Sequence, residues 1–159
     1  MIALRNILVA TDFSEASEAA LLYGQAIARQ FGATLHVFHA LDNVFMRAIM
    51  ADPHVVRASV TRRLQERLGE DRGVLAGHAI VEVSDHPADS IVAYARAAEV
   101  DLIITGTHGR TGLAHALIGS VAEQIVRRAS CPVLTVRHPE REFVTVDSAR
   151  TRRTMLTAE

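Results

Sequence analysis

The sequence predicts an α/β fold, a single domain built on a doubly wound sheet of five parallel strands with helices on both faces. Short apolar runs typical of strands buried on both faces alternate with longer stretches of helical periodicity. No hairpin signal separates successive strands, which favours parallel strands joined by right-handed helical crossovers. The chain has 159 residues, of which 49% are hydrophobic and 22% charged, the size and composition of one globular domain.

The first half of the chain contains two predicted strands and two predicted helices. Their expected ranges are residues 6–10 for a strand, about 15–31 for a helix, 34–40 for a strand and about 54–72 for a helix. Ser14 offers an N-cap for the first helix and Gly32 ends it. The apolar face of that helix is expected to carry Ala19, Leu22, Ala26 and Ile27. Residues 42–53 show no clean period.

The second half continues the alternation and ends in a tail of different character. The expected ranges are residues 77–83 for a strand, 87 to about 99 for a helix, 101–105 for a strand, 119–130 for a helix and 132–136 for a strand. Pro87 suits the first turn of its helix. We divide the chain into a domain at residues 1–138 and a C-terminal tail at residues 139–159. Within the tail, residues 143–146 can add an edge strand or dock on a partner subunit, and a partly disordered terminus is the alternative.

The expected topology places two polar segments at one point of the sheet. A doubly wound sheet binds ligands where its winding reverses, outside the carboxyl ends of the strands. With the strand order 3-2-1-4-5, the first and fourth strands flank that point. Asp12 then follows the end of the first strand and Gly106 follows the end of the fourth, so we expect the two segments to form one site.

A glycine pattern follows the fourth predicted strand. Gly106, Gly109 and Gly119, the last followed by Ser120, form G-x2-G-x9-G-S between a strand end and a helix start. Glycines let the backbone approach a ligand closely, and a helix N-terminus presents free N–H groups and partial positive charge, which suits a phosphate. The spacing differs from that of a P-loop and of a dinucleotide-binding G-x-G-x-x-G. All 17 basic residues are arginines, so backbone N–H groups, an arginine or a metal ion must meet the phosphate charge.

Composition and charge argue against several other functions. The net charge of −1 and the 4% aromatic content offer neither a basic field nor a stacking platform for nucleic acid. No apolar run approaches membrane-spanning length and no leader pattern is present, so we expect a cytoplasmic protein without membrane contact. The single cysteine, Cys131, excludes an intrachain disulfide. His36 and His39 should point to opposite faces of a strand, and no histidine spacing suggests a metal site.

Residues 4–138 resemble the universal stress protein family. The segments that carry the resemblance are residues 7–14, the pattern from Gly106 to Gly109, residues 119–123 and residues 131–134. The glycine pattern is similar to the signature of the ATP-binding branch of that family. One departure is the loop Asp85-His86-Pro87, on the base side of the expected site, where a glycine near the proline is expected.

The resemblance implies a site for an adenine nucleotide. The positions that correspond to the adenine and ribose contacts of the family are Ala10, Thr11, Asp12, Ala40, Thr105 and Gly106. The positions that correspond to its phosphate contacts are Gly109, Gly119, Ser120 and Val121. Arg110 is the nearest cation in the glycine loop. Ser120 can cap its helix, bond a phosphate oxygen or do both.

The resemblance further implies a cytoplasmic stress-response protein that binds ATP, with Mg²⁺ carried by the nucleotide, and acts as a regulatory or protective homodimer. Family members pair through the last strand, here Pro132, Val133, Leu134, Thr135 and Val136. Two alternatives stay open: a slow ATPase or phosphotransferase using the same pocket, and a nucleotide-free dimeric interaction module. The sequence shows no general base or nucleophile near the expected phosphates, which disfavours the enzyme, and no catalytic residue is assigned.

Overall fold

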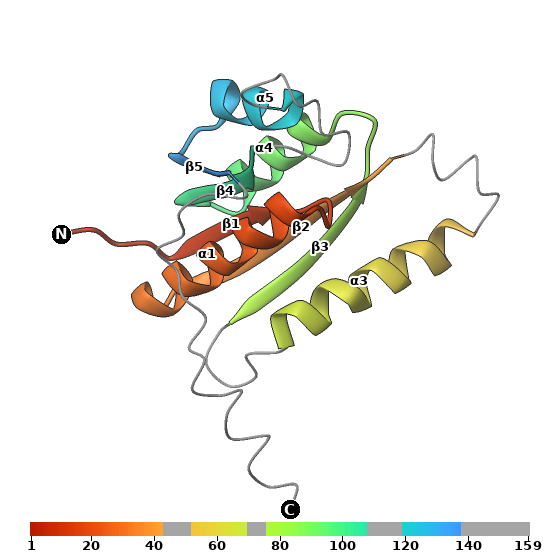
Figure 1. Ribbon diagram of the computed structural model, residues 1–159, viewed down its shortest axis with the longest axis horizontal. Helices are drawn as coiled ribbons and strands as arrows, with labels where there is room; N and C mark the ends of the chain where they lie inside the picture. Colours follow the sequence, from red (N-terminus) through yellow and green to blue (C-terminus); the bar gives the residue numbers. More distant parts are fainter. Residues whose placement is uncertain (43–51, 70–75, 108–118, 138–159) are drawn as a thin grey trace, which may run out of the picture.

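The strands of the protein form a parallel sheet that matches the predicted topology. The computed structural model describes residues 1–42, 52–69, 76–107 and 119–137 of the chain. Within these ranges, five strands pair in the order β3-β2-β1-β4-β5, all parallel (Figure 1). They are β1 (Asn6–Ala10), β2 (Thr34–Leu41), β3 (Gly77–Val83), β4 (Leu102–Gly106) and β5 (Val133–Val136). The predicted order and the predicted α/β class are confirmed.

Helices cover both faces of the sheet, as a doubly wound fold requires. The helices are α1 (Glu15–Phe31), α3 (Pro53–Gly69), α4 (Pro87–Ala97) and α5 (Ser120–Arg128). Helices α1 and α3 pack on the face formed by Ile7, Val9 and Val37, while α4 and α5 pack on the opposite face with Leu8 and Phe38 (Figure 1). Alternate residues of β1 and β2 therefore enter two different cores, which explains why both strands read as continuous apolar runs. None of these helices has the length and apolar character needed to cross a membrane.

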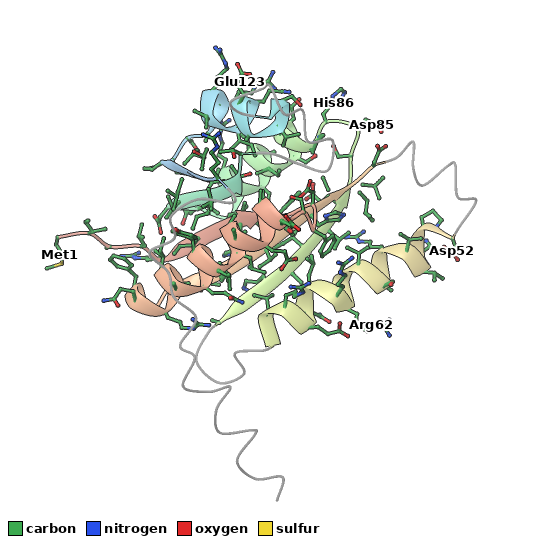
Figure 2. All side chains as sticks on the ribbon, in the orientation of Figure 1. Met1, Asp52, Arg62, Asp85, His86 and Glu123 are labelled. Atoms are coloured by element: carbon green, nitrogen blue, oxygen red, sulfur yellow. The ribbon has the colours of Figure 1, made fainter. Side chains whose placement is uncertain are left out.

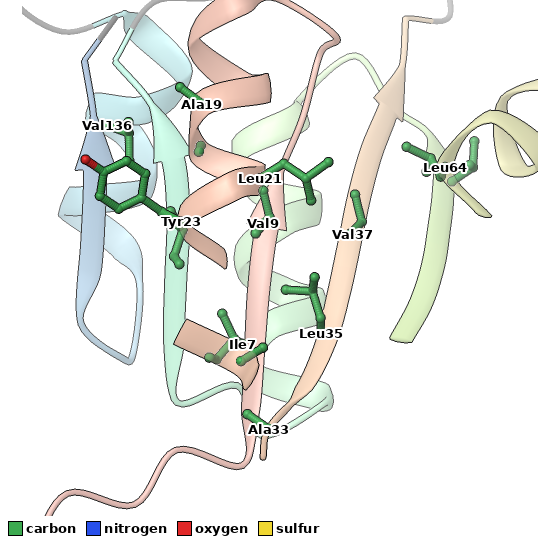
Figure 3. Close-up of a cluster of buried hydrophobic side chains, with 14 of the residues drawn as sticks. Ile7, Val9, Ala19, Leu21, Tyr23, Ala33, Leu35, Val37, Leu64 and Val136 are labelled. Atoms are coloured by element: carbon green, nitrogen blue, oxygen red, sulfur yellow. The ribbon is translucent and has the colours of Figure 1, made fainter. Parts of the chain in front are cut away.

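Helix α1 has the predicted boundaries, and its predicted apolar face is correct for Ala19 and Ile27 but not for Leu22. Ser14 is the N-cap, and its hydroxyl oxygen accepts from the backbone N–H of Ser17, while Gly32 adopts the left-handed C-cap conformation at φ 63°. Leu22 is exposed, so its placement on the buried face is wrong. The helix instead faces the sheet with its small residues, Ala16, Ala20, Gly24 and Ala28, and with Leu21 beside Val9 and Val37 (Figure 3).

The close contact between α1 and the sheet decides this rotation. A Cβ atom built on Gly24 would lie 2.3 Å from Cγ2 of Val9, nearer than any side chain permits. The missing side chain of Gly24 lets α1 approach the sheet closely along its small residues. With those residues facing the sheet, Leu22 points outward. Helical periodicity marks an apolar sector but does not show which row of that sector makes the closest approach.

Among the described residues, helix α3 packs against β3 at the edge of the sheet through a single fully buried side chain. Leu64, with 1% of its surface exposed, is its buried anchor (Figure 3). Val56, Val60 and Leu68 are partly buried and pack against the same core. Most other side chains of α3 are exposed. The predicted end of this helix at residue 72 and the predicted tail at residues 139–159 lie outside the described residues.

Candidate functional site

A cavity of about 210 Å³ opens at the carboxyl edge of the sheet, where β1 and β4 lie side by side and the winding reverses. All of the predicted site residues that lie within the described part of the chain line it: Ala10, Thr11, Asp12, Ala40, Thr105, Gly106, Gly119, Ser120 and Val121. The structure thus brings together the β1 end, the β4 end and the start of α5, three segments far apart in the sequence. Gly109 and Arg110 lie outside the described residues.

The cavity also has lining residues that the sequence analysis did not assign. They are Ser17, Phe38, Pro87, Ile91, Thr107 and Ala122. Phe38 and Ile91 add an apolar wall from β2 and α4, next to Ala40. Phe38 stands two residues before Ala40 and therefore shares its face of β2, so strand alternation contained the signal for it. The inward position of Ile91 depends on the rotation of α4, which the sequence pattern does not fix.

Asp12 is held in a tight turn at the start of α1. Its Oδ1 accepts hydrogen bonds from the backbone N–H of Ser14 at 3.0 Å and from the hydroxyl of Ser14 at 2.5 Å. This is an Asx-turn, in which a carboxylate accepts from the backbone two residues later. Asp12 is therefore a fixed acceptor at the cavity wall.

Two buried hydroxyl groups brace the same turn. The Oγ atoms of Thr11 and Ser17 lie 3.0 Å apart, and the hydroxyl of Ser17 donates to the carbonyl oxygen of Ser14 at 2.9 Å. The hydroxyl of Thr11 consequently donates to Ser17, and Oγ1 of Thr11 accepts from the N–H of Phe13 at 3.1 Å. Because these hydroxyl groups are engaged within the protein, they shape the wall of the cavity and support Asp12.

Gly106 has a packing role that accounts for the absence of a side chain. A Cβ atom at this position would lie 2.8 Å from the carbonyl carbon of Ala16 and 2.9 Å from its Cβ. Only glycine therefore lets the first turn of α1 sit against the end of β4. The backbone of Gly106 lines the cavity, and its missing side chain serves the helix contact on the other face.

Hydrogen bonds bring the two ends of the glycine pattern together. The N–H of Thr107 donates to the carbonyl oxygen of Val136 at 2.8 Å, which extends the pairing of β4 with β5. The N–H of Gly119 donates to the carbonyl oxygen of Thr107 at 2.6 Å. Although twelve positions separate Thr107 from Gly119 in the sequence, they meet at the start of α5.

Helix α5 points an N-terminus without a side-chain cap at the cavity. Gly119 is its N-cap residue and has no side chain, and none of the described side chains caps the first turn, so of the roles open to Ser120 the capping role is not observed. Ser120 is instead the first helical residue, and Ser120, Val121 and Ala122 line the cavity. The N–H groups of a first helical turn lack partners within the helix and carry partial positive charge. This end of the cavity can therefore accept an anion.

The loop before α4 takes its place at the cavity without the expected glycine. His86, which precedes Pro87, has φ −124° and ψ 71°, a backbone conformation open to residues with side chains. The hydroxyl oxygen of Ser84 accepts from the N–H of His86 at 3.0 Å and from the hydroxyl of Ser90 at 2.8 Å. Asp85 and His86 project outward beside each other, and Pro87 lines the cavity (Figure 2).

The described lining of the cavity contains one titratable side chain, and the nearby histidines are engaged elsewhere. Among the described lining residues, Asp12 has the only ionisable side chain. The described part of the chain contains no cluster of three or more residues able to hold a metal ion. His36 and His39 face opposite sides of β2, as predicted: Nδ1 of His36 bonds the hydroxyl of Tyr94, and Nδ1 of His39 donates to the carbonyl oxygen of Thr11. Burial, followed by the charge of His78, lowers the pKa of His36 from 6.5, which favours its neutral form.

Comparisons with known proteins agree on one family. The model of the "Universal stress protein family" matches residues 3–137. Universal stress protein MJ0531 of Methanocaldococcus jannaschii is 32% identical over 146 residues, which cover 87% of this chain and 85% of that protein. The solved structure of hypothetical protein MJ0577 aligns with a TM-score of 0.69 at 25% identity, over 88% of this chain and all of that one. A universal stress protein in complex with cAMP aligns with a TM-score of 0.64 at 26% identity, over 86% and 98% of the two chains.

Proposed function

This chain belongs to the universal stress protein family, and on that premise we propose that it binds an adenine nucleotide in the cavity at the switch point of the sheet. One observation carries the proposal: an apolar wall, a fixed carboxylate and the N-terminus of a helix that has glycine as its N-cap all line the same cavity. A base, a sugar and a phosphate group need those three surroundings in that combination. The structural relative in complex with cAMP adds support for a nucleotide of the adenine class.

The three parts of the nucleotide have different preferred positions. The base stacks against the apolar wall of Phe38, Ala40, Pro87 and Ile91. The ribose hydroxyls donate to the carboxylate of Asp12, because a charged acceptor makes the stronger hydrogen bond. The phosphates lie at the start of α5, where free N–H groups attract anions. Helix α1 is the poorer phosphate site, since Ser14 already caps it and the charge of Asp12 repels an anion there.

We propose ATP as the nucleotide and Mg²⁺ as an ion that the nucleotide brings with it. Gly109 and Arg110 complete the proposed set of phosphate contacts. Occupancy would bias the conformation or the partner contacts of a regulatory or protective homodimer in the cytoplasm, built from the domain at residues 1–138. The dimer contact is proposed at residues 132–136, because β5 pairs with β4 on one side and forms an edge of the sheet among the described strands.

The test is a calorimetric titration of nucleotide-stripped protein with ATP and Mg²⁺. We expect saturation near one nucleotide per chain, and a large loss of affinity in Asp12→Asn. Asp52→Asn is the matched control, because Asp52 is an exposed carboxylate that also accepts from the backbone N–H two residues later and does not line the cavity. Gly109→Val should abolish binding and leave the circular dichroism spectrum unchanged. Absence of binding up to millimolar ATP would refute the proposal and favour a nucleotide-free dimeric interaction module.

A slow ATPase or phosphotransferase using the same cavity is the enzymatic alternative. In-line phosphoryl transfer requires a group that positions the attacking water or acceptor. The described lining offers Asp12 alone, and Oδ1 of that carboxylate accepts two bonds from Ser14. Release of phosphate from ATP by the purified protein in Mg²⁺ would favour the enzyme, and absence of turnover would remove it.

A further inference from the structure

Phe13, the residue after Asp12, has an unusual backbone conformation. Its φ is 63°, in the left-handed region that residues with a Cβ rarely adopt. Phe13 is also the central residue of the turn in which the N–H and hydroxyl of Ser14 bond to Asp12. Strained backbone of this kind persists only where the surrounding structure holds it, and it gathers at functional sites.

The side chain of Phe13 is held between two other elements of the fold. Its ring centroid lies 4.7 Å from that of His39 on β2, and the guanidinium carbon of Arg63 on α3 lies 3.9 Å from the same centroid. His39 is fixed in turn, because its Nδ1 donates to the carbonyl oxygen of Thr11 at 2.8 Å. The aromatic contact and the cation–π contact both favour the position that the ring occupies.

We propose that Phe13 and Arg63 are positioning residues for the carboxylate of Asp12, within the nucleotide site proposed above, on which this inference rests. The clamped ring keeps φ of Phe13 at 63°, and that backbone conformation aims the N–H of Ser14 at Oδ1 of Asp12. The carboxylate is thereby pre-organised for the ribose hydroxyls. Helix α3 contributes to nucleotide affinity in this way, although none of its residues lines the cavity.

The coupling runs in both directions. If Arg63 favours the turn that binds nucleotide, then nucleotide must favour the position of Arg63 by the same factor. The other attachments of helix α3 among the described residues lie on its core-facing side: the packing of Leu64 and its apolar neighbours, the ion pair of Arg67 with Glu18, and the bond from Gln25 to the carbonyl oxygen of Arg67. Binding of nucleotide in the cavity is therefore expected to reduce the motion of α3. This helix is largely exposed and packs on the face of the sheet opposite α4 and α5.

The test compares two neighbouring arginines of α3 by calorimetry with ATP and with 2′,3′-dideoxy-ATP. Arg63→Gln removes the cation from Phe13 and should weaken ATP binding about 2- to 5-fold, the range of an exposed cation–π contact. Arg62→Gln is the matched control, since its side chain is 76% exposed, points away from the sheet and should leave affinity unchanged (Figure 2). Affinity for the dideoxy analogue, which lacks the hydroxyls, should stay the same in both variants.

A second pair of variants examines the ring itself. Phe13→Ala should weaken ATP binding about tenfold, through loss of both ring contacts, and Phe13→Tyr should restore it to within about twofold. Exchange of the Ser14 amide hydrogen in the ligand-free protein should become faster in Phe13→Ala and in Arg63→Gln, because the turn opens more often.

Three outcomes would overturn the inference, and they can be told apart. Equal losses for ATP and the dideoxy analogue would show a general structural effect with no relation to the ribose hydroxyls. Wild-type affinity and wild-type amide exchange in Arg63→Gln would show that the arginine does not act on the turn. Wild-type protein that binds neither nucleotide would refute the proposed function itself, whereas the first two outcomes leave that function standing.

Discussion

Replacing Gly106 by alanine tests the close contact between α1 and the end of β4. The new Cβ would lie 2.8 Å from the carbonyl carbon, 2.9 Å from Cβ and 3.0 Å from the carbonyl oxygen of Ala16. Two of those three atoms belong to the backbone, so relief requires movement of the helix. Because Gly24 already rests on Val9, α1 has little freedom to shift. Overpacking of this kind costs about 1–3 kcal/mol in the free energy of unfolding.

Gly77→Ala provides a control, because the Cβ atom added there would also lie 2.8 Å from its nearest neighbouring atom. A Cβ atom at Gly77 would lie 2.8 Å from Cδ2 of Leu68, the far end of a flexible side chain near the end of α3. A rotamer change of Leu68 can remove this contact without moving backbone. We therefore expect the free energy of unfolding of Gly77→Ala to stay within about 0.5 kcal/mol of the wild-type value.

Urea unfolding followed by circular dichroism measures both variants against the wild type. A shifted midpoint at constant slope reports a change in stability. We also expect Gly106→Ala to weaken ATP binding, because displacement of Ala16 disturbs the neighbouring Ser17 and its bond to Thr11. Equal stability of the two variants would refute the reasoning, and so would stabilisation of Gly106→Ala by the 0.4–1 kcal/mol or so typical of an unstrained glycine-to-alanine change.

Three further predictions concern pH, α3 and the sheet edge. The backbone N–H groups of Asn6 and then Arg5 lower the pKa of Asp101 from 3.8, so its contribution to stability is full above pH 3.8 and is lost as pH falls through the lower folded pKa. Unfolding free energy measured against pH should consequently be flatter at acid pH in Asp101→Asn than in the wild type. Leu64→Ala should cost about 2–4 kcal/mol in urea unfolding, because it removes the anchor of α3. Val133→Glu should shift sedimentation toward monomer, and unchanged sedimentation would place the dimer contact elsewhere.

Local chemistry explains why the element boundaries were predictable. Ser14 and Gly32 bound α1 through contacts within a few residues, and Pro87 begins α4 for the same reason. The alternation of strands and helices predicted parallel crossovers, and the resemblance to a known family implied the strand order. Once that order is fixed, Asp12 and Gly106 must lie at one edge of the sheet, so the location of the candidate site was also within reach of the sequence.

The sequence did not predict how each helix is rotated against the sheet or which residues make its closest contacts. The periodicity of α1 favoured Leu22, but the contact of Gly24 with Val9 turned that residue outward. The glycine at position 106 read as part of a ligand loop, yet its missing side chain makes room for Ala16. The sequence left Ser120 open to capping its helix or to bonding a phosphate oxygen, and the structure places the N-cap one residue earlier, on Gly119.

The sequence by itself determined the fold class, the boundaries of most elements and the segments that form the cavity. These depend on hydrophobic periodicity, capping and connection rules, which act over short stretches of chain. The tertiary structure alone decided the inward position of Ile91 at the cavity and the clamp of Arg63 on Phe13. Such contacts join residues distant in the sequence, and they depend on how closely and at what rotation each helix meets the sheet.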